Sequence, residues 1–324
     1  MTFSGSRRRI VFTLVAIVAI PVVWLATVNL LIETKDVQTT APDGIAWTMV
    51  GPHRIAYQNT PNKGGRNVLL VGGTTAWSGT WEYTRRDLAD TYNVYAIDLP
   101  PFGYSIVDPS YRYDLQSQAQ LINDIIESLA LRDVTLVAHS YGAGPSMEAV
   151  LREPEQYREL VIIDGAIHVD RETSGALAYV GTIFSIQTFR YAFTSALVHV
   201  PGFVGASIKY LVHDNSTVDE FWIDTYSQPL RNEDQSKRLA AWFYDFVFKN
   251  GTGLSSTGVN YASLRVPVSI MWGREDNLTP LSQGEYLHSL IPGSTLTVMD
   301  GVGHIPMIDD HAGYMEILRS YIAN

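Results

Sequence analysis

Six short apolar runs limit what this 324-residue chain can fold into more than any other feature. Each has four or five residues and few polar interruptions, which is typical of strands buried on both faces of a parallel sheet. Helical patterns separate several of the runs, notably Leu115–Ala130. The alternation predicts an α/β fold with a mostly parallel β-sheet covered by helices. The six runs are Asn67–Val71, Val94–Ile97, Val134–Ala138, Leu160–Ile163, Val268–Trp272 and Thr295–Met299.

Two further segments precede the first of these runs. Ile45–Val50 and Arg54–Gln58 flank Gly51-Pro52, a turn signal, and predict an opening β-hairpin. The folded part of the chain is therefore expected to begin near residue 45.

One interval breaks the alternation of strands and helices. Between residues 166 and 262 no buried strand pattern is present, but aromatic residues such as Trp222 and Trp242 recur at loose helical spacing. We expect a helical cap of residues 166–262 inserted after strand 6, with the core formed by residues 45–165 and 263–324. Most of the rings should pack the cap against the sheet, and a few should face the gap beneath it.

The amino-terminal segment has a different character. Arg7, Arg8 and Arg9 precede Ile10–Ile32, an uncharged run whose 23 residues are enough to cross the roughly 30 Å hydrocarbon core of a membrane as a helix. The arginines favour a cytoplasmic tail of residues 1–9, which places everything after a linker of residues 33–44 on the extracytoplasmic side. The alternative is a cleaved export signal and a secreted protein, although the run is longer than the usual apolar region of such a signal.

Charge and cysteine content exclude several kinds of partner and site. Acidic residues outnumber basic ones by 33 to 23, a net charge of −10, so the chain lacks the basic character that nucleic-acid binding requires. Without cysteine it can form neither disulfides nor thiolate metal sites. No histidine or carboxylate spacing suggests a metal, and no glycine-rich turn has the pattern of a nucleotide-binding loop. We therefore expect no metal, no cofactor and no nucleic-acid partner.

Ser140 lies at the junction between a predicted strand and a predicted helix. The run Val134–Ala138 leads directly into His139-Ser140-Tyr141-Gly142-Ala143-Gly144, where small residues permit a tight turn. A serine on such a bend exposes its hydroxyl above the carboxyl edge of the sheet, with a helix amino terminus pointing at it. Ser140 is therefore a candidate nucleophile, although a serine here can also simply cap the helix. His139 is expected to pack or to hydrogen-bond beneath the turn.

A serine hydroxyl is a weak nucleophile unless a base activates it, and a carboxylate usually orients that base. Both kinds of residue follow downstream, each in the loop after a predicted strand: Asp276 after Val268–Trp272 and His304 after Thr295–Met299. The chain order is serine, aspartate, histidine. Asp164, at the end of another predicted strand, is an alternative acid.

From about Ile45 to the carboxyl terminus, the chain resembles the α/β-hydrolase fold superfamily. Residues 138–142 are similar to its nucleophile elbow, residues 272–280 to its acid loop, residues 301–304 to its histidine loop and residues 98–105 to the segment after its fourth strand. The aromatic interval lies where many members carry a cap. The resemblance implies a catalytic triad of Ser140, Asp276 and His304.

The sequence departs from the family pattern at three places. Ala138 replaces the first glycine of the elbow, Pro101 stands where glycine is usual, and Gly72-Gly73-Thr74 occupies the place of a customary His-Gly pair. In this family one oxyanion-hole donor comes from the last of these loops. The resemblance therefore implies the backbone N–H groups of Thr74 and Tyr141 as the two donors.

Together these residues imply a cofactor-free serine hydrolase that forms an acyl-enzyme. A carboxylic ester of a hydrophobic substrate is the expected target, because the cap is rich in aromatic residues. The same triad serves carbon–carbon bond hydrolases and cofactor-free perhydrolases or haloperoxidase-like enzymes, which remain alternatives. A non-catalytic binding module on the same scaffold is an alternative from a different class.

Overall fold

The computed structural model describes residues 40–169, 184–248 and 253–323. The predicted membrane segment Ile10–Ile32 and the tail of residues 1–9 lie outside these ranges, as does most of the predicted linker. Within the three described ranges, no helix combines the length and apolar character needed to span a membrane.

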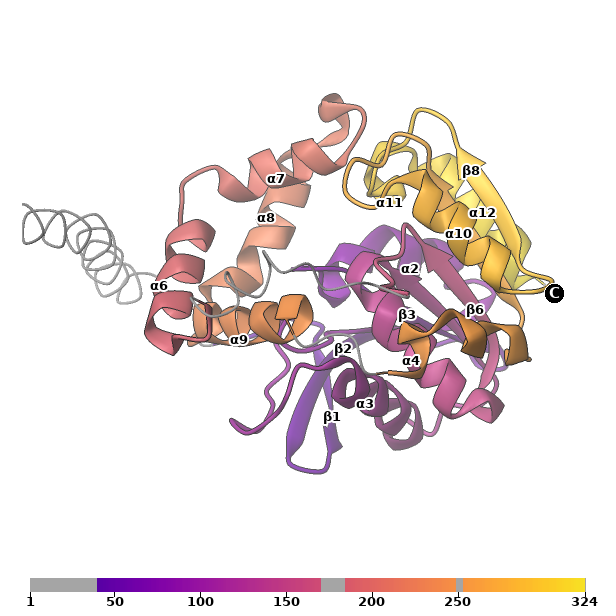
Figure 1. Ribbon diagram of the computed structural model, residues 1–324, viewed down its shortest axis with the longest axis horizontal. Helices are drawn as coiled ribbons and strands as arrows, with labels where there is room; N and C mark the ends of the chain where they lie inside the picture. The colour runs from indigo at the N-terminus through magenta and orange to yellow at the C-terminus, as the bar shows by residue number, and fades with distance from the viewer. Residues whose placement is uncertain (1–39, 170–183, 249–252, 324) are drawn as a thin grey trace, which may run out of the picture.

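Eight strands form one sheet in the order β1-β2-β4-β3-β5-β6-β7-β8 (Figure 1). β1 and β2 form an antiparallel hairpin, β2 also pairs antiparallel with β4, and all remaining neighbours are parallel. The predicted mostly parallel sheet and its opening hairpin are therefore confirmed. The strands are β1 (Ala46–Val50), β2 (His53–Thr60), β3 (Arg66–Val71), β4 (Tyr92–Ile97), β5 (Val134–His139), β6 (Tyr157–Ile163), β7 (Val268–Gly273) and β8 (Thr295–Met299).

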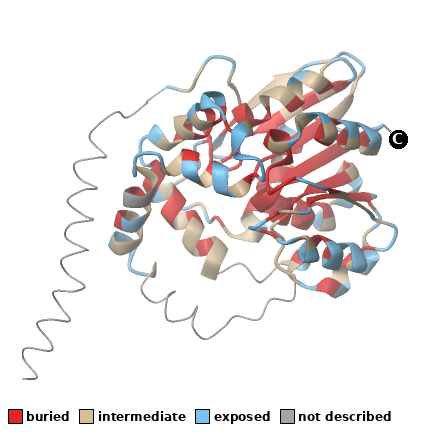
Figure 2. Ribbon diagram, turned by 90° about the horizontal axis from the view of Figure 1, so that it is seen from above, coloured by how far each residue is buried: buried red, intermediate tan, exposed pale blue. Residues whose placement is uncertain are grey.

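Helices cover both faces of the sheet, which is why its strands are apolar without alternation. In β3, Leu69 and Val71 pack into one core cluster, whereas Val68 and Leu70 pack into another on the opposite face. Figure 2 shows these strands buried between helices whose outer faces are exposed. The first cluster includes residues of α3 (Leu115–Ser128), α4 (Ala143–Arg152) and α10 (Leu281–Leu290), and the second includes residues of α2 (Glu82–Leu88), α11 (Pro306–Asp309) and α12 (His311–Ile322).

The interval between β6 and β7 contains helices and no strand in its described residues. Four helices gather on one side of the sheet core in Figure 1: α6 (Gln187–Val198), α7 (Phe203–Leu211), α8 (Glu220–Ser227) and α9 (Gln235–Phe248). We refer to the described residues of this interval, 166–169, 184–248 and 253–262, as the cap. The described residues of the core and the cap also contain short 3₁₀ helices: η1 (Ser78–Trp81), η2 (Ser140–Gly142), η3 (Pro154–Gln156), η4 (Asn215–Thr217), η5 (Gln228–Arg231), η6 (Leu254–Ser256) and η7 (Gly258–Ser263).

Polar side chains around α9 fasten the cap to the loop that follows β4. The side chains of Asn232, Gln235 and Arg238 donate hydrogen bonds to backbone carbonyl oxygens of that loop, those of Gly103, Pro101 and Ser105, at 3.0, 2.8 and 2.9 Å. These bonds hold one end of the cap near the carboxyl edge of the sheet.

Candidate active site

Ser140 lies on a strained turn between β5 and α4. Its backbone φ is +52°, a region that residues with a side chain rarely adopt. Neighbouring glycines make room for the turn, because a Cβ atom at Gly142 would lie 2.5 Å from the carbonyl oxygen of Gly72. A Cβ at Gly73 would lie 2.7 Å from the Cβ of Ser140. The glycines at positions 73 and 142 therefore allow the loop after β3 to pass directly beside the serine turn.

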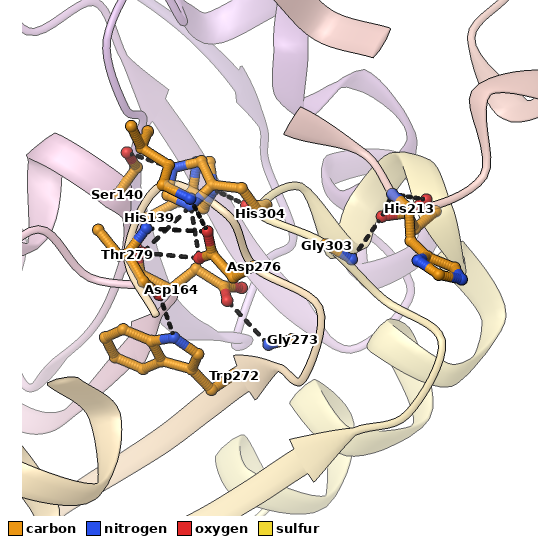
Figure 3. Close-up of polar contacts among 12 residues, drawn as sticks. His139, Ser140, Asp164, His213, Trp272, Gly273, Asp276, Thr279, Gly303 and His304 are labelled. Atoms are coloured by element: carbon orange, nitrogen blue, oxygen red, sulfur yellow. Dashed lines mark hydrogen bonds and ion pairs between the residues drawn. The ribbon is translucent and has the colours of Figure 1, made fainter. Parts of the chain in front are cut away.

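The three predicted site residues form one hydrogen-bonded row (Figure 3). The Nε2 atom of His304 is 2.8 Å from the Oγ of Ser140, and its Nδ1 atom is 2.7 Å from the Oδ2 of Asp276. All three residues are buried, with 2–5% of their surface exposed. They follow the carboxyl ends of β5, β8 and β7, so the parallel sheet brings together residues that are up to 164 positions apart.

The loop after β7 holds Asp276 in its ionised form. Oδ1 accepts the backbone N–H groups of Leu278 and Thr279 at 2.7 and 2.9 Å, and Oδ2 accepts the Thr279 hydroxyl at 2.6 Å. Burial alone would raise the pKa of Asp276, but the bonds from His304 and Thr279 outweigh it and hold the pKa below its usual value. No sequence motif identifies the role of Thr279, although aspartate side chains in turns commonly accept a backbone N–H from two residues further along the chain.

Asp164, the alternative acid, lies beside this row and faces a different partner. Its Oδ1 accepts the N–H of Gly273 at 2.8 Å. Burial and the neighbouring charge of Asp276 raise the pKa of Asp164 well above its usual value, which favours its neutral form. The carboxylate bonded to the His304 imidazole is therefore that of Asp276.

These same groups form a cluster of the kind that can bind a metal. Asp164, Asp276 and His304 each place one ligand-type atom within 4.8 Å of the others. Both imidazole nitrogens of His304 already make the bonds to Asp276 and Ser140. We therefore assign the cluster to the hydrogen-bonded row.

His139 makes a hydrogen bond, one of the two roles expected from the sequence, and its partner is the backbone of His304. Its Nε2–H donates to the carbonyl oxygen of His304 at 2.8 Å, because a carbonyl can only accept. Burial, together with the proximity of the His304 ring, lowers the pKa of His139 from 6.5 to about 3. His139 is therefore neutral near pH 7.

Asp309 links the histidine loop to the cap, a role that no local sequence pattern predicts. Its carboxylate accepts the N–H of Gly303 at 2.7 Å and the N–H groups of His213 and Asp214, just after α7, at 2.9 Å. The N–H of His304 itself donates to the carbonyl oxygen of Leu211 in α7. The position of the His304 backbone thus depends on the cap as well as on the sheet.

Two cavities meet at Ser140. The larger has a volume of about 870 Å³ and the smaller about 100 Å³, and Thr74 and Leu278 also line both. A third cavity of about 880 Å³ lies near Trp47 and Arg238 and is lined by none of the predicted site residues. The cavities that could hold a substrate for Ser140 are therefore the first two.

The predicted oxyanion donors lie at the same junction. Thr74 lines both cavities beside Ser140, and Tyr141 lines the larger one. Tyr141 is the second residue of η2, and the leading N–H groups of a helix have no partner within the helix. Thr74 and Tyr141 therefore both border the space beside Ser140.

Two known proteins of similar sequence are named as hydrolases. The chain is 27% identical over 254 residues to YugF, an uncharacterised hydrolase of Bacillus subtilis, covering 78% of this chain and 88% of that protein. It is 25% identical over 264 residues to a 2-hydroxy-6-oxo-2,4-heptadienoate hydrolase of Pseudomonas putida, covering 80% and 90% of the two chains.

A solved structure shares the fold of this chain, and a family model matches most of its length. A putative lipase from Acinetobacter baumannii superimposes with a TM-score of 0.71 at 17% identity, over 91% of this chain and 95% of that one. The sequence model of the alpha/beta hydrolase fold family matches residues 66–311, more than two thirds of the chain and all of the hydrogen-bonded row. The protein therefore belongs to the α/β-hydrolase fold family.

Proposed function

We propose that this α/β hydrolase cleaves carboxylic esters of hydrophobic substrates through an acyl-enzyme. The observation that carries the proposal is the unbroken row from Ser140 through His304 to Asp276 at the junction of two mostly apolar cavities. A hydroxyl, an imidazole and a buried carboxylate in this order are the parts that acyl transfer requires.

The reaction follows from the positions of these atoms. The Oγ of Ser140 forms a bond to the ester carbonyl carbon while its proton moves to the Nε2 of His304, 2.8 Å away. The bond from that carbon to the alcohol oxygen then breaks, and His304 gives its proton to the departing oxygen. Water attacks the resulting acyl-enzyme by the same route in reverse, releasing the acid and restoring the serine hydroxyl.

Two further groups stabilise charge in this scheme. The carboxylate of Asp276 holds the His304 ring with Nε2 directed at Ser140 and stabilises the imidazolium that forms. The backbone N–H groups of Thr74 and Tyr141 stabilise the negative charge that develops on the carbonyl oxygen.

Carbon–carbon bond hydrolysis is the second candidate, because the Pseudomonas putida relative is named for it. A dienoate substrate carries a carboxylate, which needs a cationic partner once it is buried. The described residues that line the two cavities include no lysine or arginine. Their histidines are His168 in the larger cavity and His139 and His304 in the smaller one, of which His139 is neutral near pH 7. These observations favour an uncharged ester over an anionic diketone-like acid.

The test combines a covalent probe with two substrates. A fluorophosphonate should label wild-type protein at Ser140, and the Ser140→Ala variant should remain unlabelled. Wild-type protein should cleave an uncharged aliphatic ester and should leave a 2-hydroxy-6-oxo-dienoate intact. Absence of labelling would support the non-catalytic binding module, whereas cleavage of the dienoate alone would support the carbon–carbon hydrolase.

The proposal also includes the location of the enzyme. Ile10–Ile32 is proposed as a single membrane-spanning helix that holds the hydrolase domain outside the cytoplasm. Removal of residues 1–36 should give a soluble, active enzyme, since every residue of the row lies beyond the apolar segment. A mature amino terminus near residues 26–45 would instead indicate a cleaved signal, and protection of the domain from external protease in intact cells would reverse the orientation.

A further inference from the structure

The two cavities at Ser140 differ in the catalytic groups that they contact. Ser140, Thr74 and Leu278 line both, so a carbonyl carbon bonded to Ser140 has one substituent on each side. His304 lines the smaller cavity and is absent from the lining of the larger one. The two sides are therefore not equivalent in the reaction.

The position of His304 identifies the side on which the alcohol departs. The imidazole must give its proton to the leaving oxygen, so this oxygen has to lie within hydrogen-bond reach of Nε2. Of the two cavities, only the smaller has His304 in its lining. The alcohol portion of the ester accordingly occupies the smaller cavity, and the acyl portion extends into the larger one.

The walls of the smaller cavity limit the size of the alcohol. Ile208 of α7 and Leu230 of η5 close it from the cap, while His139 and Ile305 close it from the core. Its volume is only about 100 Å³. The smaller cavity therefore favours the smaller of the two ester substituents.

The larger cavity has different walls and much more room. Ile167 follows β6, Phe246 lies on α9, and Tyr286 and Leu287 lie on α10. Its volume of about 870 Å³ is nearly ninefold that of the smaller one. These apolar side chains match a long or bulky hydrocarbon portion of a carboxylic acid.

We propose that the enzyme is selective for esters that join a large apolar acid to a short alcohol. This inference rests on the proposed ester hydrolysis and adds to it the distribution of size between the two halves of the substrate. The asymmetry follows from the placement of His304 on the side of the smaller cavity.

A pair of isomeric esters tests the proposal on the unmodified protein. Ethyl decanoate and decyl acetate have the same atoms and similar hydrophobicity, but they place the long chain on opposite sides of the carbonyl. The kcat/KM for ethyl decanoate should exceed that for decyl acetate by at least about tenfold, since even one misplaced methylene costs that much. Equal rates, or a preference for decyl acetate, would overturn the asymmetry while leaving ester hydrolysis intact. If neither isomer is cleaved, the ester function itself fails.

A matched pair of substitutions tests which cavity sets the selectivity for the alcohol portion of the ester. Ile208→Ala enlarges the smaller cavity and should raise kcat/KM for butyl decanoate relative to ethyl decanoate by about tenfold. Ile167→Ala makes the same truncation in the larger cavity and should leave this ratio unchanged. An unchanged ratio in folded Ile208→Ala, or equal changes in both variants, would contradict the assignment of the alcohol to the smaller cavity.

Discussion

The sheet core and the cap are stabilised by different sets of interactions. The hydrogen-bonded row lies at the ends of β5, β7 and β8. The residues of β5 and β7 are buried, and each of these strands pairs with a neighbour on both sides, whereas β8 is an edge strand with half-buried central residues. The cap joins this core through side-chain bonds to backbone groups, such as those of Gln235 and Asp309, and through buried apolar side chains such as Trp242. Several of its apolar side chains are exposed, including Ile186 and Phe193 of the region around α6.

This difference separates two kinds of function. The atoms that carry the chemistry follow strands of the sheet, whereas eight of the 17 residues that line the smaller cavity belong to the cap. Substitutions in the row should therefore change rates without changing stability. Substitutions in the cap should change stability or selectivity according to whether the side chain faces the core or a cavity.

The largest expected effect comes from the row. Ser140→Ala removes the nucleophile and should lower kcat for ester hydrolysis by about 10⁴-fold or more, with little change in thermal stability. Ser146→Ala is a matched control, because Ser146 is a buried serine on α4 whose hydroxyl has no hydrogen-bond partner among the described residues. Wild-type turnover by Ser140→Ala would refute the mechanism.

The Trp242 ring, at the boundary between cap and core, should affect the free energy of unfolding more than acyl preference. Trp242 on α9 packs edge-on against Phe102 and Tyr141, with ring centroids 5.0 and 5.1 Å away, and it lines neither cavity at Ser140. Trp242→Ala should lower the free energy of unfolding in urea by about 3–5 kcal/mol. It should change acyl preference less than removal of the Phe246 ring, on which Trp242 stacks at 5.4 Å. Phe246→Ala, which changes a ring that lines the larger cavity, should instead alter acyl preference.

The pH dependence of stability tests the buried His139. An unfolded chain binds a proton here below pH 6.5, but the folded protein does so only near pH 3, so stability should fall as the pH decreases from 6.5 toward 3. Burial raises the pKa of Asp98 to about 6, which acts in the opposite direction between pH 3.8 and 6.

His139→Gln isolates the contribution of the histidine, because glutamine can still donate to the carbonyl oxygen of His304. Between pH 7 and pH 5 the variant should lose about 2 kcal/mol less unfolding free energy than the wild type. The exposed His288, changed to Gln, is the control and should behave like the wild type. Parallel stability curves for His139→Gln and the wild type would show that His139 becomes charged in the folded protein.

The smallest expected effect concerns the connection between the two regions. Asp309→Ala removes the acceptor shared by Gly303 and the residues after α7, and it should lower kcat/KM by about tenfold through misplacement of His304. Asp310→Ala removes a different bond, the N-cap of α12 to Gly313, and should reduce stability without this loss of activity. Equal activity of the two variants would mean that the core alone positions His304.

The sequence determines the parts of the protein that depend on neighbours along the chain. The run Val134–Ala138 became β5 with one additional residue, and Leu115–Ala130 became α3 with two fewer. Ser140, Asp276 and His304 could be identified because each follows a strand within a few residues, and turn chemistry at such positions is local. Strand periodicity likewise predicted which segments need cover on both faces.

The tertiary structure decided what depends on segments far apart. Asp164 and Asp276 both follow buried strands, and only the packing of three loops places Asp276 against the His304 ring. Asp309 contacts residues of the cap some 95 positions earlier, a pairing that no local pattern encodes. The volumes of the two cavities depend on how the cap helices rest on the sheet, because side chains from separate elements form each wall. Local propensities act over a few residues, whereas cavity shape and the choice between two carboxylates are properties of the packed molecule.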